Sequence, residues 1–275
     1  MILTPELYGR YIDLIYKKTG LWFEPSKRYF VDKRIEERIE GLGLESFKEY
    51  YQLLKFSNND LEMQKLINRL TVNETYFFRD FPQLQSFAEG VLPEVVKIKE
   101  NEGNKKIRFW SAGCSTGEEP YTMAIIFLEM LPNPEEWTIE ILATDINTQV
   151  LNAARKGGYS SRSVKDVPPE YLERYFVERL DTYYIKKKIK DMVQFKTLNL
   201  VDGQAMLEQD QLDFIFCRNV LIYFNPESRA KVVNCFYHSL KSRGVIYLGH
   251  SESISRITNL FKIKRIGGNT VYCKP

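Results

Sequence analysis

The chain has few of the residues that build metal sites and disulfide frameworks. Its 275 residues include two histidines and four cysteines, and no two cysteines form a Cys-x-x-Cys pair. So few histidines and such scattered cysteines predict neither disulfides nor a zinc site, and we expect no bound metal. No apolar run reaches the roughly 18 residues of a membrane-spanning helix. The first six residues lack the basic and apolar stretches of a signal peptide. We therefore expect a cytoplasmic protein without direct membrane insertion.

A large excess of charge of one sign is also missing. The formal net charge is +3, from 39 basic and 36 acidic residues, which is too small an excess for a general nucleic-acid binder. Glycine and proline are sparse, while aromatic residues make up 13% of the chain, so extended disorder is not expected. A hydrophobic content of 44% suffices for a large core in one or two domains. A monomer is the default expectation.

Helix signals follow one another over the first seventy residues. Thr4-Pro5-Glu6 supplies an N-cap, a first-turn proline and an acidic residue, and Gly20 ends that helix. Ser26 is expected to cap a second helix that stops at 41–43. Further helices are expected over 46–56 and, capped by Asp60, up to residue 70. With no strand signal between them, residues 1–72 are predicted to form a small all-helical domain.

Beyond residue 100, strand patterns alternate with helix patterns. Strands are expected over 107–110, 138–144, 193–198, 213–217, 245–249, 261–266 and 270–273, and helices over 120–131, 147–156 and 226–241. Such alternation predicts an α/β fold with a doubly wound, mostly parallel sheet. Residues 267–269 are enough for an antiparallel hairpin between the last two strands but not for a crossover. A Rossmann-like sheet with this C-terminal hairpin is typical of class I methyltransferases rather than of nicotinamide-binding folds.

Two segments lie outside these patterns. Residues 160–192 contain a helix-like stretch, 170–176, and an alternating stretch, 183–190, which together predict an inserted small antiparallel β-subdomain. The Lys186–Lys190 run is expected to be a charged strand face, with a contact to a partner protein as the alternative. Residues 73–100 are predicted to be an interdomain segment, and residues 101–275 the α/β domain that carries the insertion.

A loop over residues 113–117 lies where backbone N–H groups can hold a polar ligand, between a strand and a helix. Its glycines lack dinucleotide or Walker spacing, so a pyrophosphate is disfavoured; the alternative is that they serve only the turn. Glu118 and Glu119 follow and suit a cationic amino group, but spacing does not choose between them. Asp145 ends the second strand, where an acid accepts hydrogen bonds from ribose hydroxyls or, alternatively, caps the next helix. S-adenosylmethionine (SAM) is a nucleoside ligand that fits this pattern.

Six motifs extend this interpretation. In chain order they occupy residues 73–79 (Asn-Glu-Thr-Tyr-Phe-Phe-Arg), 110–121, 143–146 (Ala-Thr-Asp-Ile), 199–200 (Asn-Leu), 216–224 (Phe-Cys-Arg-Asn-Val-Leu-Ile-Tyr-Phe) and 249–252 (Gly-His-Ser-Glu). The longest, 110–121, reads Trp-Ser-Ala-Gly-Cys-Ser-Thr-Gly-Glu-Glu-Pro-Tyr. With these motifs in this order behind a helical domain, the chain resembles the chemotaxis receptor methyltransferases, the CheR family, over nearly its full length.

The resemblance implies SAM as the cofactor, S-adenosylhomocysteine (SAH) as the product, and no metal. It implies that Glu119, rather than Glu118, holds the amino end of SAM, that Asp145 holds the ribose, and that Asn199-Leu200 lies by the adenine. The expected SAM-binding residues all come from these motifs and the 113–117 loop: Asn73, Thr75, Arg79, Gly113, Glu119, Asp145, Asn199, Leu200, Arg218 and Asn219.

The reaction implied is methyl transfer to the side-chain carboxylate of a receptor glutamate, which gives a γ-methyl ester. Glutamate is ionised at neutral pH, so the acceptor needs positioning more than acid–base help. We expect Arg79 and Tyr223 to orient that carboxylate; the alternatives are a structural salt bridge for Arg79 and core packing for Tyr223. His250 is expected to be structural. The alternatives are a SAM-dependent methyltransferase for another acceptor and a SAM-binding regulatory or scaffold protein.

The expected partners are the cytoplasmic methylation helices of chemoreceptors, with no nucleic acid. Lys27, Arg34 and Arg38 fall on one side of a helix at 100° per residue, beside an apolar stripe. The resemblance implies that this basic ridge docks on the receptor, while the alternative is a solvated helix face. Some members of the family that this chain resembles bind a receptor C-terminal pentapeptide through a longer, glycine-containing loop of the β-subdomain. Here residues 178–183 form a short loop without glycine, so the resemblance implies a member that does not depend on such a pentapeptide.

Overall fold

A computed structural model of the chain describes residues 3–56 and 60–275. The expectation that residues 1–6 are not a signal peptide falls partly on residues 1 and 2, which lie outside the described residues. The N-terminal part consists of α1 (Pro5–Thr19), the 3₁₀ turn η1 (Pro25–Lys27), α2 (Arg28–Leu42), α3 (Phe47–Phe56) and α4 (Leu61–Leu70). The Thr4 hydroxyl accepts a hydrogen bond from the Leu7 N–H at 3.3 Å, as an N-cap does. The predicted apolar stripe of α2, Val31, Ile35 and Ile39, is completely buried in the core of this domain.

Two expected caps are not formed in the helical domain. Ser26 lies within η1, and α2 begins only at Arg28, so Ser26 does not cap it. Lys27 therefore precedes α2 and does not lie on the surface of that helix with Arg34 and Arg38. The Asp60 carboxylate forms an ion pair with Lys18 at 3.1 Å, and no side-chain cap bond joins it to α4.

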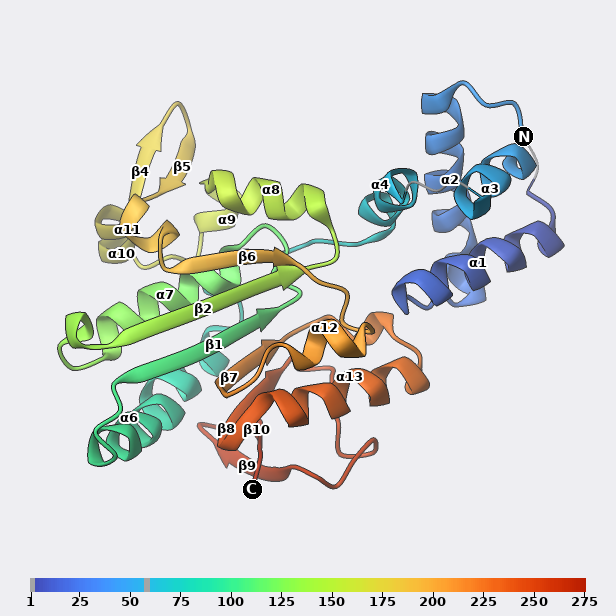
Figure 1. The fold of residues 1–275 in the computed structure, drawn as a ribbon. Helices are drawn as coiled ribbons and strands as arrows, with labels where there is room; N and C mark the ends of the chain where they lie inside the picture. The colour runs from blue at the N-terminus through green and yellow to red at the C-terminus, as the bar shows by residue number, and fades with distance from the viewer. Residues whose placement is uncertain (1–2, 57–59) are drawn as a thin grey trace.

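The larger domain is built on a seven-stranded sheet in the order β6-β2-β1-β7-β8-β10-β9 (Figure 1). The strands are β1 (Lys106–Ala112), β2 (Thr138–Asp145), β6 (Val193–Thr197), β7 (Leu212–Cys217), β8 (Leu240–Leu248), β9 (Lys262–Ile266) and β10 (Asn269–Cys273). The first five in spatial order pair in parallel, whereas β10 pairs antiparallel with both β8 and β9. This confirms the predicted parallel sheet with a C-terminal hairpin.

Helices cover both faces of this sheet (Figure 1). The short α12 (Gly203–Leu207) and α13 (Pro226–Ser239) pack on one face, while α7 (Glu118–Met130) and α6 (Leu92–Asn101) pack on the other. Successive side chains of β7 point to opposite faces of the sheet and so contribute to the hydrophobic core on each face. Phe214 and Phe216 belong to one core, and Ile215 and Cys217 belong to the other. The 3₁₀ turn η3 (Pro134–Glu136) precedes β2, and the helix α8 (Thr148–Lys156) follows it.

The sequence interpretation missed a helical segment before β1. Residues expected to be interdomain form α5 (Phe81–Gln85), the π-helical turn η2 (Ser86–Val91) and α6. Phe87 in η2 is fully buried, and its ring meets those of Phe127, Phe214, Phe216 and Tyr247 edge-on with centroids 5.0 to 5.9 Å apart. Only residues 71–80 therefore remain as a connection between the two domains.

The predicted β-subdomain is a separate antiparallel sheet of three strands in the order β3-β5-β4. It comprises β3 (Gly158–Tyr159), α9 (Ser161–Val164), α10 (Pro169–Tyr175), β4 (Phe176–Arg179), β5 (Thr182–Ile185) and α11 (Lys187–Lys190). The expectation of a charged strand face over Lys186–Lys190 is wrong, because the strand ends at Ile185 and the lysines form a helical turn anchored by the buried Ile189. Among the described residues, no helix is long and apolar enough to span a bilayer.

Candidate functional site

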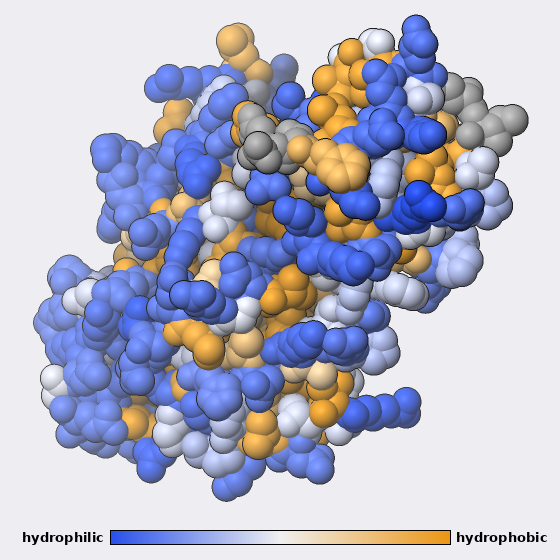
Figure 2. All heavy atoms as spheres, turned by 45° about the vertical axis from the view of Figure 1, so that its right-hand side comes forward, coloured by the Kyte–Doolittle hydropathy of each residue, from blue (hydrophilic) through white to orange (hydrophobic). Residues whose placement is uncertain are grey.

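One cavity lies between the helical domain and the carboxyl ends of the parallel strands. Its walls come from the loops after β1, β2, β6 and β7, from the connection over residues 71–79, and from Leu21, Trp22 and Phe23 of the helical domain. Apolar surface is visible where the two domains meet (Figure 2). All eleven residues that the sequence analysis assigned to SAM or to the acceptor line this cavity: Asn73, Thr75, Arg79, Gly113, Glu119, Asp145, Asn199, Leu200, Arg218, Asn219 and Tyr223.

The loop after β1 approaches the turn after β7 so closely that it requires glycine. Gly113 has φ +85°, and a Cβ atom there would lie 2.4 Å from Cγ2 of Val220. The N–H groups of Gly113 and Cys114 both donate to the Thr144 carbonyl, at 2.8 and 2.9 Å. The loop is thereby fixed against the end of β2.

Asp145 is buried at the end of β2, and its two oxygens accept from the backbone on either side. Oδ2 accepts from the Ser115 N–H at 2.9 Å, and Oδ1 accepts from the Asn147 N–H at 2.8 Å. Burial raises the pKa of Asp145, and these hydrogen bonds oppose that rise. The side chain of Asn147, not that of Asp145, caps α8. The capping role considered for Asp145 is therefore not observed.

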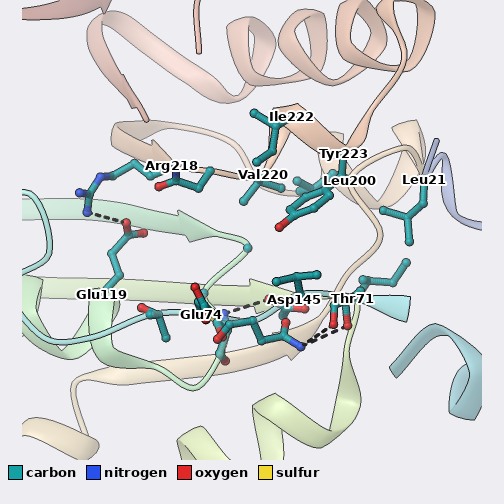
Figure 3. A pocket seen from close by; sticks show the side chains of 18 of the residues that line it. Leu21, Thr71, Glu74, Glu119, Asp145, Leu200, Arg218, Val220, Ile222 and Tyr223 are labelled. Atoms are coloured by element: carbon teal, nitrogen blue, oxygen red, sulfur yellow. Dashed lines mark hydrogen bonds and ion pairs between the residues drawn. The ribbon is translucent and has the colours of Figure 1, made fainter. Parts of the chain in front are cut away.

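The two acids at the start of α7 have different surroundings. Glu119 lines the cavity, accepts from the Ser111 hydroxyl at 2.7 Å, and pairs with Nη1 of Arg218 at 3.2 Å (Figure 3). Glu118 is 2% exposed and accepts instead from the Thr116 hydroxyl at 2.6 Å, away from the cavity. Burial raises the pKa of Glu118. Of the two acids that spacing did not distinguish, only Glu119 reaches the cavity.

Arg218, just after β7, joins three parts of the site. Besides Glu119, its guanidinium donates to the Asp80 carboxylate at 2.6 Å and to the Arg79 carbonyl at 2.8 Å. Its side chain is only 4% exposed. A buried cation with two acidic partners is firmly held in place. Arg218 therefore fixes the end of the interdomain connection against the sheet edge.

The connection over residues 71–79 forms one wall. The Asn73 carbonyl accepts from the Ser115 hydroxyl at 3.1 Å, which ties the connection to the loop after β1. Arg79 donates to the Glu74 carbonyl at 2.9 Å and is partly exposed at the cavity. Thr75 lies between them on the same wall.

The turn after β7 forms the opposite wall. Asn219 has φ +60°, and its buried Oδ1 atom has no hydrogen-bond partner within the described part of the chain. Tyr223, at the end of η4 (Leu221–Tyr223), extends into the cavity from the side opposite Glu74 and Asp145 (Figure 3). Burial raises the pKa of its phenol, and the nearby Arg79 acts in the opposite direction.

Asn199 and Leu200 line the end of the cavity nearest the helical domain. Leu200 is buried and contributes apolar surface. The side chain of Asn199 donates to the Lys18 carbonyl at 3.0 Å and accepts from the Val201 N–H at 3.2 Å. Asn199 therefore also bridges the two domains, a contact that the sequence analysis did not anticipate.

The three basic residues expected to dock on a receptor do not form one free ridge. Arg38 forms two hydrogen bonds with Glu62, at 2.8 and 2.9 Å, and the two side chains are 15% and 11% exposed. Arg34 pairs with Glu37 at 2.8 Å, and Lys27 is exposed but precedes α2. The expectation of a shared helix surface is wrong on this point, because Arg38 stabilises the helical domain internally.

Comparison with known proteins identifies the family. Residues 6–71 match the CheR methyltransferase all-alpha domain, and residues 73–268 match the CheR methyltransferase SAM-binding domain. The chain belongs to the CheR methyltransferase family. This CheR chain is 45% identical to chemotaxis protein methyltransferase 2 of Vibrio cholerae, over 100% of this chain and 95% of the relative. It is 35% identical to the chemotaxis protein methyltransferase of Borreliella burgdorferi, over 94% and 92%. The corresponding values for the chemotaxis protein methyltransferase of Salmonella typhimurium are 34%, 99% and 91%.

The cavity of this CheR chain is chemically suited to SAM. It offers a carboxylate at Asp145, a second acid at Glu119, the orphaned Oδ1 of Asn219, and apolar surface from Leu198 and Leu200. Hydrogen-bond acceptors such as these suit the hydroxyls of a ribose and an ammonium group, and the apolar surface suits a purine ring. Among residues 3–56 and 60–275, no cluster of His, Cys, Asp or Glu could hold a metal ion.

Sequence reasoning missed several contributors to this site. Asp80 directly follows the 73–79 motif and pairs with Arg218, but no pattern marked it. Glu252 was noticed only as part of the Gly-His-Ser-Glu motif. Leu21, Trp22 and Phe23 carry no local signal, because they reach the cavity only through the packing of the helical domain on the turn after β7.

Proposed function

We propose that this chain methylates glutamate side chains of chemoreceptors, with SAM as the methyl donor, and that it forms γ-glutamyl methyl esters and SAH. The observation that carries the proposal is a single cavity that combines the acids suited to SAM with Arg79 and Tyr223 on its walls. The full-length similarity to proteins named chemotaxis protein methyltransferases supports a chemoreceptor as substrate. It does not favour the regulatory or non-receptor alternatives.

The binding of SAM is assigned to the ten cavity residues named above, of which two have the most specific tasks. Asp145 accepts from the ribose hydroxyls, and the backbone bonds from Ser115 and Asn147 pre-orient its carboxylate. Glu119 accepts from the amino group, and Arg218 keeps that carboxylate in place. When bound, SAM supplies an activated methyl group.

The acceptor side requires orientation rather than proton transfer. A glutamate has a reference pKa of about 4.3 and is ionised at neutral pH. Arg79 can align it through the planar donor fork of its guanidinium. Tyr223, on the opposite wall, can donate its hydroxyl, because its raised pKa keeps the phenol protonated. Enclosure by the two walls limits access of water.

The chain is proposed to act in the cytoplasm on the methylation helices of receptors. Lys27 and Arg34 are the residues proposed to contact the receptor, since Arg38 is engaged with Glu62. Independence from a receptor pentapeptide is supported by the tight β4–β5 connection, which has only Leu180 and Asp181 between four-residue strands. The monomeric state stays a prediction.

The test is methyl transfer from radiolabelled SAM to membranes that contain a chemoreceptor from the same cell. Alkali-labile label on the receptor, absent when its target glutamates are alanines, is the expected result. Arg79→Ala should keep SAM binding within about tenfold and lose most turnover. SAM binding without any receptor label would contradict the proposed function, and wild-type turnover in Arg79→Ala would remove Arg79 from the reaction.

The adjacent acids provide a matched control for the SAM site. Glu119→Gln should weaken SAH binding about tenfold or more, because it removes a charge from the cavity wall. Glu118→Gln makes the same chemical change one residue earlier and should leave SAH binding unchanged. Equal losses in the two variants, measured by calorimetry, would contradict the assigned role of Glu119.

A further inference from the structure

A single carboxylate organises the turn that carries Asn219 and Tyr223. Glu252 lies in the loop between β8 and β9, and its Oε2 atom accepts from the Asn219 and Gly249 N–H groups, both at 2.8 Å. Its Oε1 atom accepts from the Val220 N–H at 2.9 Å and from the Ile222 N–H at 3.3 Å. Four backbone donors from two loops therefore converge on one side chain.

These donors need such a partner because of the local backbone. The turn after β7 leaves the sheet with Asn219 at φ +60° and closes only a short 3₁₀ turn, so its first N–H groups have no strand or helix to bond to. A carboxylate offers acceptor sites for several donors at once. Glu252 satisfies these N–H groups and ties the end of β7 to the end of β8.

The loop that carries Glu252 is shaped to allow this approach. At Gly249, an added Cβ atom would lie 2.8 Å from Oε2 of Glu252 and 2.9 Å from the Asn219 nitrogen. Only glycine leaves room for the carboxylate to reach the turn. Gly249 and Glu252 are the two ends of the Gly-His-Ser-Glu motif, to which the function proposed above assigns no task.

We propose that Glu252 is a positioning residue that holds the 219–223 turn in the shape that presents Asn219 and Tyr223 to the cavity. Glu252 does not itself line the cavity, so it acts through the turn and not on a ligand. The proposal rests on the proposed function for its effect on turnover. Its effect on ligand binding through Asn219 does not depend on the identity of the acceptor.

Two substitutions separate this role from ordinary packing. Glu252→Gln keeps the size of the side chain but exchanges one oxygen for an NH₂ group, which then faces two backbone donors. Glu252→Asp shortens the side chain by one methylene but keeps both oxygens and the charge. A positioning role through the four N–H bonds predicts more turnover in the Asp variant than in the Gln variant. A role in filling space predicts the reverse order.

The experiment measures SAH affinity by calorimetry and kcat at saturating SAM on receptor membranes, below the melting temperature of each variant. Glu252→Gln is expected to lower kcat roughly 100-fold and SAH affinity roughly tenfold, the scale of losing two charge-assisted hydrogen bonds. Glu252→Asp is expected to lose roughly tenfold in kcat. Glu227→Gln, on the exposed surface of α13 and paired with Lys231, is the matched control and should behave as wild type.

The outcomes are distinct. Wild-type kcat and SAH affinity in Glu252→Gln, or more turnover in the Gln than in the Asp variant, would overturn the proposal. If the wild-type chain methylates no receptor, the proposed function fails. In that case the tenfold loss of SAH affinity in Glu252→Gln, compared with Glu227→Gln, still tests the positioning role.

Discussion

The close approach of Gly113 to Val220 makes the two walls of the cavity mechanically dependent on each other. In Gly113→Ala, the new Cβ atom would lie 2.4 and 3.3 Å from the two Cγ atoms of Val220 and 3.4 Å from its Cβ atom. The first contact is far inside van der Waals range, so the loop after β1 or the turn after β7 must move. In Val220→Ala both Cγ atoms are absent, and the remaining contact is an ordinary one.

The expected cost of Gly113→Ala has two parts. A φ of +85° costs a residue with a Cβ atom about 1–2 kcal/mol. Overpacking against Val220 adds about 1–3 kcal/mol. The free energy of unfolding should therefore fall by roughly 2–5 kcal/mol. Only the second part can be recovered by Val220→Ala, so the double variant should show a favourable coupling energy of about 1–3 kcal/mol.

A double-mutant cycle measures this coupling. Urea unfolding of the wild type, both single variants and the double variant gives the free energies, and calorimetry gives the SAH affinity of each. We expect Gly113→Ala to weaken SAH binding and the double variant to recover part of the loss. Additive free energies, within about 0.5 kcal/mol, would refute the contact as the cause.

Two further predictions concern charged residues outside the cavity. Arg38→Ala removes two hydrogen bonds to Glu62, which keeps only the Tyr50 hydroxyl at 3.0 Å and Lys65 at 3.6 Å, and should lower the free energy of unfolding by about 1–3 kcal/mol. Arg34→Glu should cost less stability, because its pair with Glu37 is more exposed, and should instead raise the apparent KM for receptor at unchanged SAM affinity. Equal destabilisation by Arg38→Ala and Arg34→Glu, or an unchanged KM in Arg34→Glu, would contradict a stabilising role for Arg38 and a receptor-binding role for Arg34. Burial raises the pKa of Glu118, so the folded chain keeps this proton to a higher pH than the unfolded chain. The stability that this group contributes is present below the unfolded pKa of about 4.3 and is lost as pH rises through the folded pKa. Glu118→Gln should therefore reduce the loss of stability between pH 4 and pH 7 in urea titrations, and parallel pH profiles would contradict it.

Much of this architecture could be predicted from the sequence because its signals are local. Alternating apolar residues and short turns specified the strands and the C-terminal hairpin, and Thr4 and Gly20 marked both ends of α1. The π-helical turn around Phe87 was missed because its stability comes from four aromatic rings distant in sequence. Lys187–Lys190 was misassigned because a short alternating run fits a strand and a helical turn equally well.

The site residues also divide into those that local sequence signals mark and those that only long-range contacts bring into place. Residues that line the cavity and are assigned to ligand binding, such as Asp145, stand at the ends of recognisable strands. The partners that hold them could not be predicted, because their bonds cross between segments far apart in the chain. Arg218 and Asp80 are 138 positions apart, and Asn219 and Glu252 are 33 apart. Likewise, the pairing of Arg38 with Glu62 depends on how α2 packs against α4.

The bonds around Asp145 suggest why a helical domain accompanies this SAM-binding domain. Asn147, which donates its N–H to Asp145, also donates its side-chain amide to the Asn68 carbonyl and the Thr71 hydroxyl, at 3.1 and 2.7 Å. The Asn68 side chain in turn accepts from the Thr148 N–H at 3.0 Å. The acid proposed to bind the ribose is therefore two residues from one of the polar contacts between the domains. Since Leu21, Trp22 and Phe23 of the helical domain line the cavity together with the 71–79 connection, a shift of the helical domain would move one wall of the proposed SAM site.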